Sequence, residues 1–546
     1  MSRRWPALVL LPGLLIGAAV IDRGDTGGGA AVVASSPGTD DGDDAIEIRS
    51  IEPATAMPVA SAPTALGATW YCAGGTAYDS GVEARDPVAP EPPSEAPPVE
   101  GEAAEALTEP VAPLVADHSV IVANPTDRPV EALVTVFGEQ GDPVSTDLAV
   151  DAFSQGRLRL SDLLQAPYAA ALVEVPGGGV AVEHSVRGPF GYDAAPCASS
   201  ASDQWFFAAG ATTSDAQEVL TIFNPFPDAA NIDITFSAED GVRTPGAFEG
   251  MIVPGRSVVA AELGPVVTRR SQLSATVTAR TGRVVVDRLQ SYDGSGPGVE
   301  ESGPVGLTVG LGAPRPAPVW YFPDGKKVEG ATERFTIYNP TDREAAIDLT
   351  LTLADPANDG EVEPFELTVR PAAATVVDLT AEERVPDDVA YSAVARSLNG
   401  VPVVVERTDH RGGDDSSREG TAIALGSPLE ATDWLFPAGA ATERIDEWLT
   451  VLNPSADRTA TVRISALADG QLLGISELQD LKIAPGTRRA VRLGEQIQRA
   501  ELATMVTSDE PIVVERGLYL VEDTGISTHI GIPLISGARL PPDPTG

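Results

Sequence analysis

Lysine, cysteine and histidine are all scarce in this sequence. Of its 546 residues two are cysteine and four are histidine, and lysine occurs only at positions 326, 327 and 482. A zinc-binding scaffold needs about four Cys or His ligands for each metal ion. We therefore expect no metal site and no cofactor held by such residues.

Positive charge is also in short supply. The 79 Asp and Glu residues outnumber the 37 Lys and Arg residues, which gives a formal charge of −42. This excess repels the phosphates of nucleic acids and of anionic lipids. The sequence therefore predicts no nucleic-acid partner, and loose binding of a divalent cation such as calcium is left open.

The overall composition is that of a folded, turn-rich protein. Hydrophobic residues make up 43% of the chain, too many for a wholly disordered protein, and there are 53 glycines and 47 prolines. Such a composition is typical of all-β proteins. The length corresponds to roughly three to five domains.

The N-terminus has the pattern of an export signal. Arg3 and Arg4 precede an apolar run of 17 residues from Trp5 to Ile21, which is about 25 Å long as a helix. A basic start followed by an apolar run directs export, and no small-x-small cleavage site follows this run. We therefore expect residues 5–21 to remain as a membrane anchor, with a cleaved signal and a secreted protein as the alternative. Either places the rest of the chain outside the cytoplasm.

Residues 22–67 are rich in Gly, Ser, Pro, Ala and Asp. A segment of this composition buries too little apolar surface to order itself. We predict a disordered acidic linker.

Three landmarks recur four times in the same order after this linker. The first is a tryptophan followed by aromatic or apolar residues, at Trp70, Trp205, Trp320 and Trp434. The second is an Asn-Pro pair, at Asn124, Asn224, Asn339 and Asn453. The third is an apolar run that ends in an acid, at Glu183, Asp287, Glu406 and Glu515. In the first copy 35 additional residues separate the first two landmarks, and the Pro- and Glu-rich stretch near 83–113 is predicted to be a disordered insertion.

Each copy reads as a series of strands. On both sides of Asn339-Pro340 apolar and polar residues alternate, as at Phe335 and Ile337 before the pair and at Ile347 and Leu349 after it. This pattern predicts a β-hairpin with one buried face, and a short helix is expected over Arg489 to Arg499. About seven strands in roughly 115 residues favour an immunoglobulin-like β-sandwich over a propeller blade. The predicted repeats span 68–200, 201–315, 316–430 and 431–546.

The two cysteines are expected to form a disulfide. Cys72 follows the first landmark tryptophan, and Cys197 lies near the end of the same predicted repeat. In an exported protein an isolated pair is normally oxidised. A reactive or metal-binding pair is the alternative.

Catalytic motifs are missing from the sequence. His118, His184, His410 and His529 are scattered and are expected to be surface or sheet residues. The sequence contains no nucleophile elbow, zinc-protease helix, phosphate loop or dinucleotide fingerprint. The pairs Asp287-Arg288, Glu406-Arg407 and Glu515-Arg516 recur at one strand position, which favours a cross-strand ion pair over a catalytic acid. We therefore predict no catalytic residue and no enzyme.

The repeated Trp-aromatic-Phe-Pro-x-Gly, Asn-Pro and Val-Val-Val-Glu-Arg segments resemble uncharacterised exported proteins of actinobacteria, a family of unknown function. The resemblance implies an envelope location and no assigned activity. We therefore expect a non-catalytic envelope scaffold or protein-interaction module whose partner is an envelope protein or glycan. A glycan-binding array is one alternative, although Trp448 is the single tryptophan outside the signal and the landmarks. An enzyme with its site on the first repeat is the other.

Overall fold

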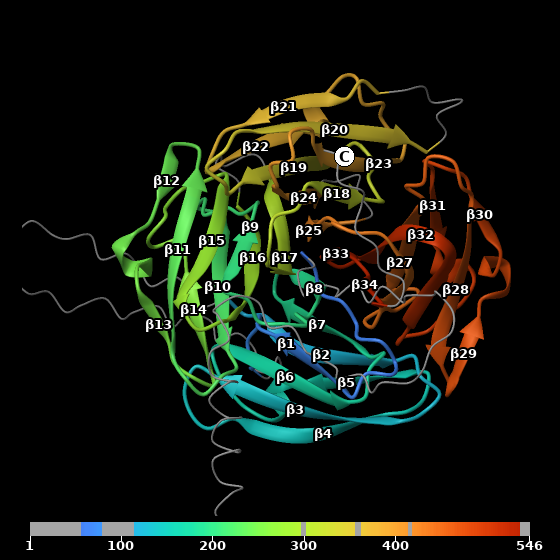
Figure 1. The fold of residues 1–546 in the computed structure, drawn as a ribbon, viewed down its shortest axis with the longest axis horizontal. Helices are drawn as coiled ribbons and strands as arrows, with labels where there is room; N and C mark the ends of the chain where they lie inside the picture. The colour runs from blue at the N-terminus through green and yellow to red at the C-terminus, as the bar shows by residue number, and fades with distance from the viewer. Residues whose placement is uncertain (1–55, 79–113, 296–301, 355–361, 413–417, 536–546) are drawn as a thin grey trace, which may run out of the picture. The chain divides into compact units, whose positions relative to one another are not determined.

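A computed structural model describes residues 56–78, 114–295, 302–354, 362–412 and 418–535. These residues form antiparallel sheets (Figure 1), which confirms the predicted all-β class. The predicted anchor and insertion lie outside the described residues. Within the described residues no helix is long and apolar enough to cross a membrane.

We use the four predicted ranges as names, copy 1 to copy 4, although their boundaries remain predictions. In each copy one sheet carries the landmark tryptophan and the other carries the landmark acid, and we call them the tryptophan sheet and the acid sheet.

In copy 1 the tryptophan sheet has the order β1 (Gly67–Cys72), β6 (Ala169–Pro176), β3 (Val130–Gly138) and β4 (Val144–Val150), and the acid sheet has the order β5 (Ser154–Arg159), β2 (Asp117–Asn124), β7 (Ala181–Gly188) and β8 (Gly191–Pro196). In copy 2 the tryptophan sheet has the order β12 (Gly241–Arg243), β11 (Ala230–Ala238), β15 (Leu273–Thr281) and β9 (Gln204–Phe207), and β13 (Met251–Val253) also pairs with β11. Its acid sheet has the order β14 (Ser257–Glu262), β10 (Ala216–Asn224), β16 (Val285–Ser295) and β17 (Ser302–Leu311).

In copy 3 the tryptophan sheet has the order β18 (Val319–Phe322), β23 (Tyr391–Ser397), β20 (Ala345–Leu353) and β21 (Phe365–Val369). Its acid sheet has the order β22 (Ala373–Asp378), β19 (Ala331–Asn339), β24 (Val404–Arg411) and β25 (Gly420–Leu425). Copy 4 contains β26 (Ala431–Phe436), β27 (Ile445–Leu452), β28 (Ala460–Ala468), β29 (Gln471–Gly474), β30 (Leu481–Ile483), β31 (Arg488–Arg492), β32 (Ala503–Leu520), β33 (Ile526–Ile530) and β34 (Ile532–Pro533). Its β32 runs through both sheets and pairs with β26 and β28 in one and with β27 and β33 in the other.

Short 3-10 segments interrupt the strands at η1 (Leu160–Asp162), η2 (Gly246–Phe248), η3 (Leu379–Ala381), η4 (Ser476–Leu478) and η5 (Leu493–Glu495). The helix predicted over Arg489 to Arg499 is wrong, because this stretch consists of most of β31, the 3-10 segment η5 and four residues outside any helix or strand. Pairing of β31 with β27 fixes its backbone as a strand despite the helix-forming side chains.

The segment around each Asn-Pro pair is an arch and not the predicted hairpin. β19 and β20 flank Asn339-Pro340, yet they pair with strands of different sheets. Alternation shows only that each strand buries one face, and this holds equally when the turn crosses from one sheet to the other. The sequence pattern therefore found the strands but not their partners.

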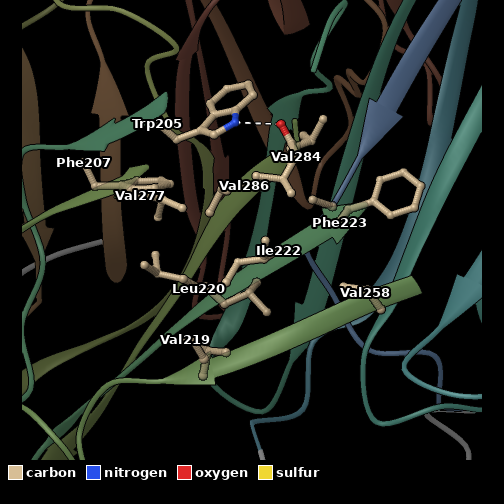
Figure 2. Close-up of a cluster of buried hydrophobic side chains, with 14 of the residues drawn as sticks. Trp205, Phe207, Val219, Leu220, Ile222, Phe223, Val258, Val277, Val284 and Val286 are labelled. Carbon is tan, nitrogen blue, oxygen red and sulfur yellow. Dashed lines mark hydrogen bonds between the residues drawn. The ribbon is translucent and has the colours of Figure 1, made fainter. Parts of the chain in front are cut away.

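The landmark tryptophans of copies 2, 3 and 4 connect the two sheets of their copy. The indole Nε1 of Trp205 donates to the carbonyl of Val284 at 2.8 Å (Figure 2), and that of Trp320 donates to Val403 at 2.7 Å. Trp434 makes the corresponding bond to Ile512 at 3.1 Å. Each accepting residue lies three positions before the landmark acid, so the tryptophan fixes the start of the acid strand.

The hydrophobic cores follow the copies, and each borrows side chains from the preceding copy. Phe206 of copy 2 packs in the core of copy 3, and Tyr321 of copy 3 packs in that of copy 4. Leu435 and Ile532 of copy 4 pack in the core of copy 1, and Ala73 of copy 1 packs in that of copy 2. The contacts therefore form a closed cycle.

Residues 56–66 correct the predicted linker. Ala56, Met57 and Ala60 are buried, and Ala60 exchanges backbone hydrogen bonds with Pro533 and Ile535 of copy 4. The apolar side chains of Ala56-Met57-Pro58-Val59-Ala60, which we call the strap, provide the burial that the rest of the linker composition lacks.

Cys72 and Cys197 form a disulfide, and both are fully buried. The bond joins β1 to the segment after β8 and so links the two sheets of copy 1.

Candidate functional site: buried joints between the copies

The landmark acid and the residue after it lie where two copies meet. The basic residue of one copy faces the acid of the next, and we call each such contact a joint. The pairs are His184 with Asp287 in the first joint, Arg288 with Glu406 in the second, Arg407 with Glu515 in the third, and Arg516 with Glu183 in the fourth, which returns to copy 1. The predicted cross-strand ion pair is therefore wrong, because the partner belongs to the neighbouring copy. One sequence cannot reveal such a partner, since the two residues are more than 100 positions apart.

The three arginine joints are closely paired. Arg288 makes a two-pronged contact with Glu406, at 2.9 Å from Nη1 to Oε2 and 3.1 Å from Nη2 to Oε1. Arg516 Nη2 donates to Glu183 Oε2 at 3.0 Å. All of these side chains are at least 97% buried, so their charges interact in a medium of low polarity.

Each acid also accepts hydrogen bonds from the backbone after the landmark tryptophan of the preceding copy. Glu406 accepts the N–H groups of Ala208 and Ala209 at 2.8 and 2.7 Å. Asp287 accepts those of Ala73 and Gly74, Glu515 accepts that of Asp324, and Glu183 accepts that of Ala438. The two strongest sequence landmarks therefore meet each other across every joint.

A third titratable side chain comes from the strand before the Asn-Pro pair, six residues ahead of the asparagine. It is His118 in copy 1, Glu218 in copy 2, Glu333 in copy 3 and Glu447 in copy 4, and all four are buried. Sequence reasoning missed this position, although its constant spacing from the asparagine could have revealed it.

Burial sets the proton affinity of these third groups. It raises the pKa of Glu218 to about 8 and that of Glu447 to about 8, and the neighbouring arginine acts in the opposite direction in both copies. It raises the pKa of Glu333 to about 7, although Arg407 opposes the shift and the Tyr391 hydroxyl donates to Glu333 at 2.6 Å. These carboxyls therefore hold a proton near neutral pH.

A landmark glycine makes room for the third group. A Cβ atom on Gly210 would lie 2.5 Å from a carboxyl oxygen of Glu218, and one on Gly439 would lie 2.7 Å from Glu447. In copy 1 a Cβ on Gly75 would lie 2.5 Å from His118. The glycine five residues after the tryptophan is thus a packing requirement.

The first joint is built from different residues. His118 Nε2 lies 3.0 Å from His184 Nδ1, and His184 Nε2 lies 3.5 Å from Asp287 Oδ2. The structure thus brings together two histidines that are 66 positions apart in the sequence, which scattered positions did not suggest. His529 is also buried beside Arg516 in the fourth joint, whereas His410 is half-buried against Thr421.

The last strands of the acid sheets also meet in cyclic order near one another (Figure 1), as β8 contacts β17, β17 contacts β25, β25 contacts β33, and β33 contacts β8. Asp193 of β8 accepts from the Thr308 hydroxyl and the Val309 N–H of β17, both at 2.8 Å. Ser527 of β33 donates to the carbonyl of Ala194. Thr421 of β25 donates to the carbonyl of Val305 of β17.

A glycine begins or precedes each of these strands or lies within it, at Gly191, Gly306, Gly420 and Gly525. A Cβ on Gly306 would lie 2.5 Å from Thr421, and one on Gly420 would lie 3.0 Å from Ile526. The copies approach too closely here for any side chain.

Trp448, which the glycan alternative depends on, is half-buried. Its Nε1 donates to Asp446 at 3.0 Å, and the Arg418 guanidinium lies 5.9 Å from its ring centre. Part of the stacking surface is thus already used within the protein.

The arrangement binds the copies to one another. Acids, arginines and histidines converge there, as in an active site, but the acid and the base of each joint are buried and face each other across two copies. Among the described residues no group of three His, Cys, Asp or Glu side chains could hold a metal ion.

Comparisons with known proteins place the chain in a family. A family model described as "Family of unknown function (DUF5719)" matches residues 189–298 and 314–513, more than half of the chain. The solved structure "Crystal Structure of Thermotoga maritima 1070" is similar at 25% identity over 20% of this chain and 94% of its own, with a TM-score of 0.18. A tetra-tandem repeat in the extending region of a large adhesion protein is similar at 14% identity over 75% of this chain and 93% of its own, with a TM-score of 0.09. No match is found among curated proteins. The chain belongs to the family of unknown function DUF5719.

Proposed function

We propose that the protein is a non-catalytic scaffold or protein-interaction module of the cell envelope, exported or anchored by residues 5–21. The observation that carries this proposal is the use of the recurring acids and bases within the joints. Eight such side chains are each at least 97% buried, and each faces a neighbouring copy. Residues that could perform acid–base chemistry thus hold the protein together.

An extracytoplasmic location is part of the proposal. The disulfide between Cys72 and Cys197 supports it, because such bonds persist in oxidising compartments. The acidic charge adds solubility there and disfavours binding to anionic surfaces.

Partners are proposed to bind at the open ends of the tryptophan sheets. Among the described residues β4, β12, β21 and β29 each end a strand order, with a neighbouring strand on one side. An edge of this kind presents free backbone groups to an added strand or loop. β4 is the longest of the four, at seven residues.

The test combines partner capture with an activity assay on the full chain. We expect in-cell crosslinking to recover the same envelope partner with the wild type and with Trp448→Ala, and to lose it when Ser145 and Asp147 on β4 are replaced by proline. Purified protein should release no product from wall glycan or wall peptides. Turnover that His118→Gln abolishes would overturn the proposal in favour of an enzyme with its site on copy 1. Loss of binding to envelope glycans in Trp448→Ala would instead favour the glycan-binding array.

A further inference from the structure

The first joint differs from the other three in the chemistry of two groups, the base and the third titratable side chain, and its acid is a shorter carboxylate. Where the second joint has Glu218, Arg288 and Glu406, the first has His118 on β2, His184 on β7 and Asp287 on β16. His118, His184 and Asp287 are fully buried. An arginine keeps its protons at any physiological pH, but a histidine does not. The first joint can therefore respond to pH through its base.

Hydrogen-bond direction fixes where the hydrogens lie in this joint. His118 Nδ1 lies 3.1 Å from the carbonyl oxygen of Ala169, which can only accept, so Nδ1 carries a hydrogen. Neutral His118 then has an accepting Nε2, and His184 Nδ1 must donate to it across 3.0 Å. It follows that neutral His184 has no hydrogen on Nε2.

This leaves two proton acceptors facing each other. His184 Nε2 lies 3.5 Å from Asp287 Oδ2, and the same oxygen accepts the N–H groups of Ala73 and Gly74 at 2.8 Å each. With one proton between them the contact is attractive, either as imidazolium with carboxylate or as imidazole with carboxylic acid. Without that proton a lone pair faces a buried carboxylate.

We propose that protonation controls the contact between copies 1 and 2. The contact is tight when His184 and Asp287 share one proton. It loosens when this proton is lost to solvent or when a second proton binds His118. In the second case His118 Nε2 becomes a donor, and two N–H groups face each other. The joint is thus most stable in an intermediate pH range and is less stable at both lower and higher pH.

The surroundings set the position of this window. The charged or titratable groups that face His184 are His118, Asp287 and, from β33, His529, behind which lie Arg516 and Glu183 of the fourth joint. Burial lowers the pKa of His118 to about 4 and raises the pKa of Asp287 to about 7. The stabilisation from Asp287 is present at low pH and is lost as the pH rises through about 7. That from neutral His118 is present above about 6.5 and is lost as the pH falls through about 4.

The direct test is nuclear magnetic resonance of the wild-type chain with isotope-labelled histidine, since there are only four histidines to assign. We expect His118 to be protonated on Nδ1 alone at pH 6 to 8, and His184 to be protonated on Nδ1 throughout. A His184 that carries its hydrogen on Nε2 and not on Nδ1 at pH 7.5 would overturn the proposal. This measurement needs no substitution and so does not depend on the folding of a variant.

The second test is hydrogen exchange of two matched peptides, Trp70–Gly75 in the first joint and Trp205–Gly210 in the second. It is run in Glu218→Gln protein, which removes the titrating third group of the second joint. After correction for the intrinsic rate, we expect protection of the first peptide to fall at least about tenfold between pH 6 and 8.5 and that of the second to stay constant.

Asp287→Asn should abolish this pH dependence, because the amide oxygen still accepts the two N–H groups but cannot ionise. Equal behaviour of the two peptides, or an unchanged pH dependence in Asp287→Asn, would contradict the proposal.

Discussion

At the residue scale, the joints show how burial changes the meaning of a charged side chain. Glu218 and Glu447 sit beside an arginine that already pairs with another acid. A second ionised carboxylate there adds desolvation cost without a second cation. Both groups therefore favour the neutral acid.

We predict that Glu218→Gln combined with Glu447→Gln stabilises the protein at alkaline pH. Since the folded pKa of each carboxyl is raised to about 8, the stability it contributes is complete below the unfolded pKa and is lost as the pH rises through about 8. The variant should match the wild type at pH 4 and exceed it at pH 9 by up to about 1.4 kcal/mol for each unit of pKa shift removed. Urea unfolding at the two pH values measures this, and a variant that is less stable at pH 9 would refute it.

The landmark glycines give a second prediction at this scale. Gly210→Ala places a methyl group 2.5 Å from Glu218, and we expect a loss of roughly 1–3 kcal/mol from overpacking. Gly264→Ala is the control, because a Cβ there meets no atom within 4 Å. Thermal unfolding of both variants makes the comparison, and equal melting temperatures would show that the close contact costs nothing.

At the scale of strands, the Asn-Pro arch depends more on the asparagine than on the proline. Asn339 Nδ2 donates to the carbonyls of Arg343, Val369 and Arg370, and its Oδ1 accepts from the N–H of Thr341. It thus ties together two places where the chain crosses between sheets. Asn124, Asn224 and Asn453 make the corresponding bonds.

We therefore expect Asn339→Ala to destabilise the protein by roughly 1–3 kcal/mol, since it leaves buried carbonyls without a donor. Pro340→Ala should cost less than about 1 kcal/mol, because it mainly frees the unfolded chain. Chemical denaturation of the two variants measures the loss in the free energy of unfolding. A larger loss for Pro340→Ala than for Asn339→Ala would show that the proline is the more important residue of the arch.

Strands and landmarks could be predicted from the sequence, whereas pairings across space could not. Trp205, Asn339 and Glu406 stand out because each recurs at a fixed place in its copy. The contact of Glu406 with Arg288 and the order of strands in each sheet depend on residues far apart in the chain, and alternation carries no information about them. The recurring position of His118 could not be recognised from residue identity, because the other three copies have glutamate there.

At the scale of the whole described chain, the four copies form a cycle of contacts, and the strap adds contacts to each of them. The strap touches copy 1 through the bond from Val59 N–H to Ser199 Oγ at 3.2 Å, and copy 4 through Ala60. Ala56 belongs to the same buried cluster as Phe206 of copy 2 and Trp320 of copy 3, and the Ser427 hydroxyl of copy 3 donates to the sulfur of Met57.

We predict that Met57→Asp combined with Ala60→Pro loosens the fourth joint. The first change puts a charge into an apolar cluster, and the second removes the N–H that donates to Pro533. Hydrogen exchange at Ala438, whose N–H donates to Glu183, should rise before that at Ala208. Leu66→Asp is the control, because this side chain is 99% exposed. Unchanged exchange at Ala438 would show that the strap is not needed for closure.

The pairing of Ala60 with Leu534 has a further consequence. Since Ala60 exchanges backbone hydrogen bonds with Pro533 and Ile535 on either side of Leu534, we expect the described fold to tolerate circular permutation, in which a short peptide connects Ile535 to Ala56 and new ends are opened between copies 2 and 3. Such a permutant would carry a fused reporter at the junction of copies 2 and 3 and would keep the pairing of Ala60 with Leu534.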